Sequence, residues 1–182
     1  MKTNEPTAVT EADRKKYMRA ALGRAKTAFK NGETPVGAVI VRDGKIIAGG
    51  RNKRENGKCA LCHAELDAIR AASKKLGGWR LVGCELYVTL EPCPMCAGAI
   101  IASRIEKVYY GASDKKAGAF GGVFDLNAQP LNHHPAVEGG VCEYECSQIL
   151  RDFFTQLRYS KKVQKLTARA SDDTDTPDSR KA

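Results

Sequence analysis

Long apolar runs are missing from this sequence of 182 residues. No segment approaches the roughly 18 consecutive apolar residues of a membrane-spanning helix, which excludes a helical membrane protein. The first 14 residues are polar and charged and lack the apolar core of a signal peptide. No internal repeat stands out either. We therefore expect a protein with no membrane partner and a cytoplasmic location.

Acidic residues are in the minority. The chain has 30 Lys and Arg against 21 Asp and Glu, a net charge of +9. Four aspartates against Arg180 and Lys181 give residues 171–182 a net charge of −2, which leaves +11 on the remainder. A basic surface indicates a polyanionic partner, and nucleic acid is the obvious class. Ordinary solvation of Lys and Arg is the competing explanation for these charges.

The seven cysteines do not form the even set that a disulfide framework requires. Together with the missing signal peptide, the odd number favours reduced thiols. We expect some of them to be metal ligands and the others to be buried or spare. They stand at positions 59, 62, 84, 93, 96, 142 and 146.

Helical and strand-like patterns alternate along the chain, which predicts an α/β domain layered around one mixed sheet. Thr10 to Asp13 resembles a capping box, and Asp43-Gly44 is a hairpin turn signal. The expected helices cover 11–31, 64–76, 94–103 and 141–165, and the expected strands cover 36–41, 45–49, 86–90 and 107–110. The helix over 94–103 is apolar nearly all round and is expected to be buried.

The remaining segments are expected to be loops or ends without regular structure. Residues 51–58 are polar and charged, and residues 111–140 are rich in Gly and Ala without clear periodicity. We predict one domain over 11–166, a disordered N-terminus over 1–10 and a disordered acidic tail over 167–182.

Two short motifs carry the chemistry. His63-Ala64-Glu65 and Pro92-Cys93-Pro94-Met95-Cys96 supply one imidazole and two thiols, which can occupy three corners of a zinc tetrahedron. An open fourth corner is typical of catalytic zinc. Glu65 lies two residues from His63 and is free to move protons. The spacing H-x-E…P-C-x-x-C resembles the signature of the zinc nucleobase deaminases.

Other uses of these residues stay open. A C-x-x-C pair also occurs in redox and structural sites, and a single helical glutamate is most often solvated. Residues 59–63 fit C-x-x-C-H, the attachment pattern of c-type haem, which would need export and would take His63 from the zinc set. For Cys59 and Cys62, a separate zinc or redox role is a further alternative to spare thiols.

From residue 14 to 162 the chain resembles the bacterial tRNA-specific adenosine deaminases of the cytidine deaminase superfamily. The resemblance rests on the stretches 33–39, 63–65, 86–99, 103–105 and 111–114. The first three recur across purine and pyrimidine deaminases and support the reaction more than the substrate. Residues 114–119, Asn132-His133, and Phe153-Phe154 with the basic helix behind them, resemble the tRNA enzymes in particular.

The resemblance implies a three-layer α/β/α fold with a central mixed sheet of about five strands. It also implies a homodimer with one Zn²⁺ per subunit, held by His63, Cys93 and Cys96. The implied reaction is hydrolytic deamination of adenosine to inosine at the wobble position of an arginine tRNA anticodon, with Glu65 as catalytic residue. The implied substrate-binding residues are Asn52, Ala64, Pro35, Val36, Asp114, Asn132 and Phe154. The implied contacts to the RNA backbone are Arg151, Arg158, Lys161 and Lys162.

Two other functions are compatible with the motifs. One is deamination of a small substrate such as guanine, cytosine or a nucleotide, although such a substrate would not need a basic C-terminal helix. The other is a zinc-stabilised RNA-binding module without catalysis. Glu65 discriminates against that module, because a purely structural zinc site has no use for a proton carrier.

Overall fold

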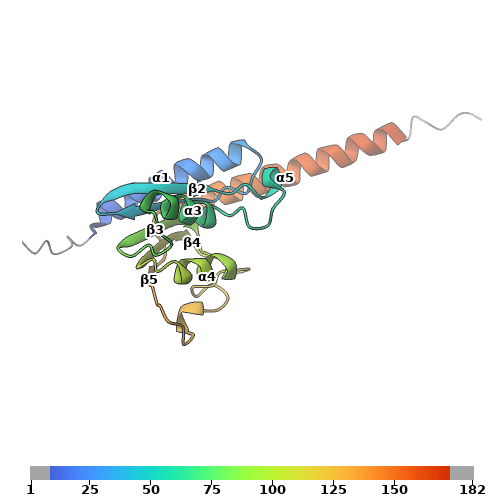
Figure 1. Ribbon diagram of the computed structural model, residues 1–182. Helices are drawn as coiled ribbons and strands as arrows, with labels where there is room; N and C mark the ends of the chain where they lie inside the picture. The colour runs from blue at the N-terminus through green and yellow to red at the C-terminus, as the bar shows by residue number, and fades with distance from the viewer. Residues whose placement is uncertain (1–8, 173–182) are drawn as a thin grey trace, which may run out of the picture.

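The structure is a computed structural model that describes residues 9–172 (Figure 1). The helices are α1 (Glu11–Lys30), α2 (Arg54–Gly57), α3 (Ala64–Leu76), α4 (Pro94–Ala102) and α5 (Glu143–Asp172). The strands are β1 (Gly37–Arg42), β2 (Lys45–Arg51), β3 (Cys84–Leu90), β4 (Lys107–Ala112) and β5 (Ala136–Glu138), and a 3₁₀ turn, η1, covers Leu126–Ala128. Within the described range, no helix has both the length and the apolar character needed to cross a membrane.

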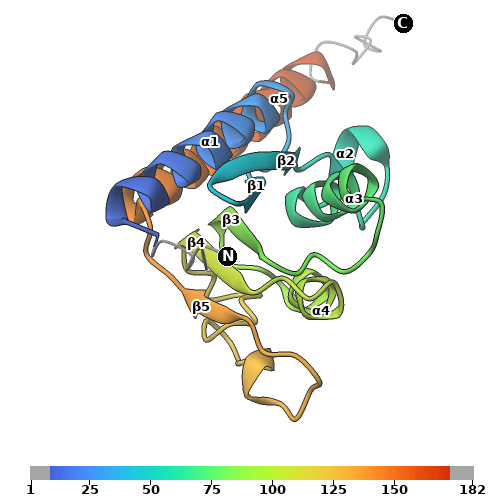
Figure 2. The same cartoon turned by 60° about the vertical axis from the view of Figure 1, so that its left-hand side comes forward.

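The strands form a single mixed sheet in the order β2-β1-β3-β4-β5. Strand β1 runs antiparallel to β2 and β3, whereas β4 runs parallel to β3 and β5. Helices α1 and α5 cover one face of the sheet, and α3 and α4 cover the other (Figure 2). The predicted three-layer fold around a mixed sheet is therefore confirmed.

The sheet has a buried apolar core on each of its two faces, and the alternation of side chains along the strands explains both. Ala38 and Ile40 of β1 pack with the alanines of α3, whereas Val39 and Val41 pack against α1. Successive side chains of a strand point to opposite faces, so a fully apolar strand serves both layers. This sheet is thus buried on both sides at its centre, which gives the loops at its edge a rigid base.

Local signals at the start of the chain are realised as predicted. Thr10 accepts a hydrogen bond from the Asp13 N–H and the Asp13 carboxylate accepts from Thr10, which is a capping box at the start of α1. Asp43 and Gly44 both have positive φ, 49° and 69°, as a type I′ hairpin turn requires.

Two predicted loops contain regular structure. Residues 51–58 include the single-turn helix α2, and residues 111–140 include η1 and the short strand β5. Each of these elements has three or four residues, which is too short for periodicity to reveal.

The C-terminal boundary and the burial of α4 also differ from expectation. Helix α5 continues to Asp172 and so enters the segment 167–182 that was predicted to be disordered, because Ala and Arg favour helix there. The rest of that segment, and residues 1–8, lie outside the described residues. Helix α4 leaves Pro94 and Ala102 exposed, so it is buried on one side only.

Candidate active site

The three predicted metal ligands lie at the starts of two helices on the same face of the sheet. His63 is the N-cap of α3, Cys93 is the N-cap of α4, and Cys96 lies in the first turn of α4. Pro94 follows Cys93 in that turn, where its missing N–H costs no hydrogen bond. Helix N-termini carry partial positive charge, which favours thiolates at this position.

The distances within the cluster fit a zinc ion. His63 Nδ1 lies 3.7 Å from Cys93 Sγ and 3.4 Å from Cys96 Sγ, and the three donor atoms lie within 4.8 Å of one another. Zn–S bonds of about 2.3 Å and a Zn–N bond of about 2.0 Å, at a tetrahedral angle, place N and S about 3.5 Å apart. The donor set can therefore hold zinc through three protein ligands, as catalytic zinc sites do.

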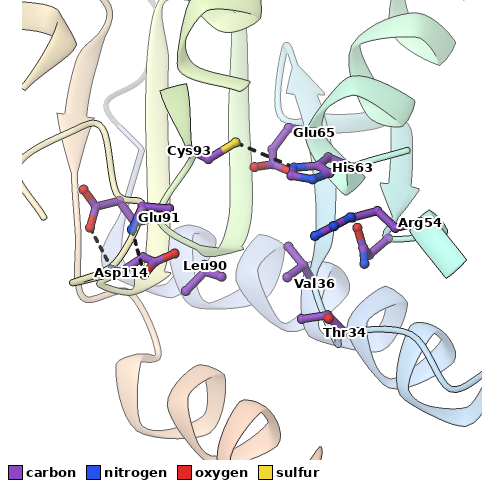
Figure 3. Close-up of a pocket in the computed structure, with 11 residues that line it drawn as sticks. Thr34, Val36, Arg54, His63, Glu65, Leu90, Glu91, Cys93 and Asp114 are labelled. Atoms are coloured by element: carbon purple, nitrogen blue, oxygen red, sulfur yellow. Dashed lines mark hydrogen bonds between the residues drawn. The ribbon is translucent and has the colours of Figure 1, made fainter. Parts of the chain in front are cut away.

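Glu65 reaches the cluster from the first turn of α3 and is 4% exposed. Burial raises the pKa of its carboxyl group. Its Oε2 atom is buried, and among the described residues it has no hydrogen-bond partner. Such an atom costs about 1–3 kcal/mol, which a ligand that donates a hydrogen bond would recover. Figure 3 shows Glu65 and His63 together on one side of the pocket, facing Cys93.

The cluster stabilises negative charge on Cys93. A hydrogen bond from the Cys96 thiol, with further help from His63, lowers the pKa of Cys93 to about 4 although burial acts in the opposite direction. The pKa of Cys96 is raised, because its proton is donated to Cys93 and because it is buried. The protein alone thus favours one thiolate, and a divalent cation would stabilise the second.

A cavity of about 190 Å³ opens at the cluster. It is smaller than the roughly 300–1,000 Å³ of pockets for drug-sized ligands, so it suits one planar ring system. The predicted residues that line it are Val36, Asn52, His63, Glu65, Cys93 and Asp114. In Figure 3, Glu91 and Asp114 lie on one side of the cavity and Arg54 on the other.

Two more predicted residues lie next to this lining. Ala64 is fully buried at the first position of α3, where its backbone N–H has no carbonyl partner within the helix. Pro35 is buried and precedes Val36. Asn52 itself is 5% exposed, and its Nδ2 atom donates to the buried carboxylate of Glu33 at 3.5 Å.

The predicted RNA-contacting residues lie outside the cavity. Asn132 is exposed and does not line it, and Phe154 is 42% exposed on α5. The basic side chains predicted to meet the RNA backbone are all exposed along α5: Arg151, Arg158, Lys161 and Lys162. His133 is half-buried, and its Nε2 atom lies 2.7 Å from the carbonyl oxygen of Ile105, which accepts a hydrogen bond from it.

Some lining residues were missed by sequence reasoning. Arg54 lies in a segment predicted to be a loop, and Glu91 lies in the stretch 86–99, where it was given no role of its own. The other missed lining residues are Thr34, Leu90 and Ala117. The placement of Glu91 directly before the P-C-x-x-C motif is the one signal that could have singled it out. Burial raises the pKa of Glu91, but hydrogen bonds from Asp114, Gly122, Phe120 and Ser113 outweigh it and lower the pKa.

The second C-x-x-C pair lies beside the cluster but outside it. Cys59 and Cys62 are half-buried in the turn between α2 and α3, where the Cys62 N–H donates to the Cys59 carbonyl at 3.1 Å. The imidazole of His63 lies with Cys93 and Cys96, which is the arrangement of the zinc hypothesis and not that of the haem pattern.

Comparison with known proteins places this geometry in a family. A model described as MafB19-like deaminase matches residues 12–158. A tRNA-specific adenosine deaminase of Bacillus subtilis (strain 168) is 49% identical over 148 residues, which cover 81% of this chain and 92% of that protein.

Two solved structures are similar in fold. One, from studies of A-to-I editing by tRNA deaminases at the wobble position of transfer RNA, is 44% identical with a TM-score of 0.70 over 74% of this chain and 99% of that one. A guanine deaminase from Bacillus subtilis is 37% identical with a TM-score of 0.53 over 68% of this chain and 82% of that one. The chain belongs to the MafB19-like deaminases and, among them, to the group of the tRNA-specific adenosine deaminases.

Proposed function

We propose that this protein is a zinc-dependent hydrolase that deaminates adenosine to inosine at the wobble position of a tRNA anticodon, with an arginine tRNA as substrate. In this reaction water replaces the amino group at C6 of the base, and ammonia leaves. The observation that carries the proposal is the buried Oε2 atom of Glu65, which faces the His63–Cys93–Cys96 cluster in a base-sized cavity.

The chemistry follows from this arrangement. Bound by His63, Cys93 and Cys96, one zinc ion per subunit would supply Lewis-acid chemistry that lowers the pKa of water to about 7. Glu65 accepts a proton from the attacking water and passes it to a ring nitrogen of the base. It then takes the proton of the hydroxyl group newly formed at C6 and passes it to the amino group, which leaves as ammonia. Burial raises the pKa of Glu65, which suits a group that must both accept and return a proton.

The cavity has polar groups suited to a purine. Asn52 presents its side-chain amide, and the N–H of Ala64 is one of the unsatisfied donors at the start of α3. Val36, which follows the buried Pro35, supplies an apolar wall against which a flat ring would pack. A base must leave its stack to enter such a cavity, and anticodon loops expose bases in this way.

The surface around the cavity suits RNA. Asp114 at the edge of the cavity and the exposed Asn132 would meet nucleotides that flank the reacting base. Phe154 offers an aromatic face on α5, and Arg151, Arg158, Lys161 and Lys162 offer exposed positive charge along the same helix. A tRNA substrate also fits a cytoplasmic location.

The exposed face of helix α4 supports the proposal that the protein forms a homodimer. Its composition is apolar throughout, yet Pro94 and Ala102 are exposed and Met95, Gly98 and Ala99 are only half-buried. An uncovered apolar helix face is typical of an interface between subunits. The same helix carries Cys93 and Cys96, so a second copy docked there would lie next to the zinc site.

Deamination of a free base is the second candidate, because the cavity is small and the chain is 37% identical to a guanine deaminase. The exposed basic helix α5 favours RNA over a free base. Turnover of an arginine-tRNA anticodon stem-loop, compared with free guanine, cytosine and adenine, separates the two. Release of ammonia from a free base alone would overturn the RNA proposal.

The Glu65→Gln variant tests the mechanism directly. Glutamine keeps the size of the side chain but cannot carry a proton, so inosine formation should fall by about three orders of magnitude or more while the zinc content stays at one ion per chain. Glu145→Gln, on the exposed side of α5, is the matched control and should behave as the unaltered protein. Activity retained in Glu65→Gln would contradict the assigned role.

A further inference from the structure

Glu91 is a buried carboxylate in the cavity wall for which the proposed chemistry has no use. It follows β3 directly, is 2% exposed, and lies two residues before Cys93. A buried carboxylate is costly unless its oxygen atoms accept hydrogen bonds. Its partners therefore indicate what it does.

Within residues 9–172, the Glu91 carboxylate accepts four hydrogen bonds, and all four come from residues 113–122, which we call the rim segment. Its Oε2 atom accepts from the Ser113 hydroxyl at 3.0 Å and from the Asp114 N–H at 2.9 Å. Its Oε1 atom accepts from the N–H groups of Phe120 and Gly122 at 3.1 and 2.8 Å. A carboxylate has about four acceptor positions, so Glu91 is saturated by this segment.

The backbone of the rim segment is fitted to the carboxylate. A Cβ atom built on Gly118 or on Gly122 would overlap the carboxylate of Glu91. The rim segment lies between β4 and η1 and joins no strand of the main sheet. The rim segment is joined to other parts of the described chain by the four bonds to Glu91 and by one from the Ala119 N–H to the Pro92 carbonyl oxygen. Its other backbone bonds stay within residues 114–126, so Glu91 supplies most of the contacts that hold it in place.

The rim segment in turn forms part of the cavity. Asp114 and Ala117 line it, and Asp114 accepts from the N–H groups of Lys116 and Ala117 at 2.9 and 3.2 Å, which shapes the turn. Figure 3 shows the hydrogen bond that joins Glu91 to Asp114 at the edge of the cavity. One side chain thereby connects this edge to the strand end that leads into Cys93.

We propose that Glu91 is a positioning residue for substrate binding, whose carboxylate holds the rim segment against the cavity and so sets where Asp114 and Ala117 meet the substrate. It touches neither the metal cluster nor the reacting atoms. The kinetic part of this inference rests on the proposed deamination, whereas the structural part does not.

The Glu91→Gln variant tests it, because one end of the amide would present N–H groups to two donors of the rim segment. We expect amide hydrogen exchange within residues 113–122 to be about ten-fold faster, with exchange in α3 and α5 unchanged and one zinc ion still bound. With the anticodon stem-loop, KM should rise by about ten-fold while kcat changes less than three-fold.

Glu106→Gln is the matched control, since Glu106 also accepts a backbone hydrogen bond, from the Gly83 N–H at 2.8 Å, but lies on an exposed surface. It should leave both measurements unchanged. Unaltered exchange in the rim segment of Glu91→Gln, or a fall in kcat with KM unchanged, would overturn the inference. If the unaltered protein forms no inosine, the proposed function fails, and the exchange measurement alone still decides the role of Glu91.

If Glu91→Gln does not fold, a second variant tests the same inference. Gly118→Ala keeps Glu91 but displaces the rim segment from it, and should give the same local exchange and the same rise in KM. Gly23→Ala on α1, where a Cβ meets nothing within 4 Å, is its control. Wild-type exchange and KM in Gly118→Ala would overturn the inference as well.

Discussion

The carboxylate of Glu33 lies against Asn52, with Oε2 3.5 Å from the Nδ2 atom of the amide, and only 1% of Glu33 is exposed. The same carboxylate accepts from the N–H groups of Glu55 and Asn56 at 3.2 and 2.8 Å, at the start of α2. Glu33 therefore holds both the amide that faces the cavity and the turn of helix that carries Arg54. Glu33 thus supports the edge of the cavity formed by Asn52 and Arg54, in the way proposed for Glu91 at the opposite edge.

Glu33→Gln should lower stability and weaken substrate binding together. The amide would place N–H groups against backbone donors in a buried site, which costs about 1–3 kcal/mol. Urea unfolding measures the first effect and KM for the stem-loop the second. Glu55→Gln changes an exposed glutamate of α2 and should leave both the stability and KM unchanged. If Glu33→Gln behaves like Glu55→Gln, the role of Glu33 is contradicted.

Removal of zinc by a chelator should abolish turnover and lower the melting temperature while the far-UV circular dichroism stays native. The ion would connect the starts of α3 and α4. A ligand at about 1,000 times its Kd adds about 4 kcal/mol to the free energy of unfolding, which raises the melting temperature by roughly 10 °C for a domain of this size. Added Zn²⁺ should restore both properties. A melting temperature that does not respond to chelation would argue against zinc at His63, Cys93 and Cys96.

The order in which iodoacetamide alkylates the cysteines should follow the burial and pKa of each thiol. Burial raises the pKa of Cys146 to about 12, so at pH 8 this thiol stays protonated and unreactive toward iodoacetamide until the protein unfolds. With zinc bound, the half-buried Cys59 and Cys62 should be alkylated before Cys146. Without zinc, the half-buried Cys93, whose pKa is lowered to about 4, should be alkylated first. Peptide mass spectrometry with and without zinc measures the order, and early labelling of Cys146 would contradict the packing of α5.

The basic helix should control the salt dependence of RNA binding. Replacing Lys161 and Lys162 with alanine removes two phosphate contacts, which should weaken binding and reduce the slope of log K against log salt by about 1.4 for single-stranded RNA. Lys74 and Lys75, exposed at the end of α3, provide a control pair. An equal effect of both pairs would show that net charge, and not α5, attracts the RNA.

Short sequence patterns were sufficient to predict the helices that are defined by contacts between neighbouring residues. The capping box at Thr10 and the apolar spacing of α3 predicted those helices, and α3 spans 64–76 as expected. Strand β5 could not be predicted, because its three residues are half-buried or exposed and its pairing with β4 joins Lys107 to Ala136 across the sheet. A short strand of this kind is defined by its partner and not by its own residues.

The same distinction holds for the site. His63, Glu65, Cys93 and Cys96 belong to two short motifs, so their residue types and spacing were enough to propose a zinc cluster, and the fold brings His63, Cys93 and Cys96 together. The supporting carboxylates act over longer distances, since the bonds of Glu91 reach 22 to 31 residues along the chain. No spacing within the sequence encodes such contacts, which depend on how β3 and the rim segment meet.

The arrangement of the layers separates two tasks. The metal-binding residues belong to the helices on one face of the sheet, whereas the long basic helix α5 packs with α1 on the other face and extends beyond it (Figure 1). Under the proposed function, substitutions in α5 would therefore alter how RNA is held without disturbing the metal cluster. A protein built in this way would change its choice of RNA by remodelling its last helix while it keeps the same hydrolytic core.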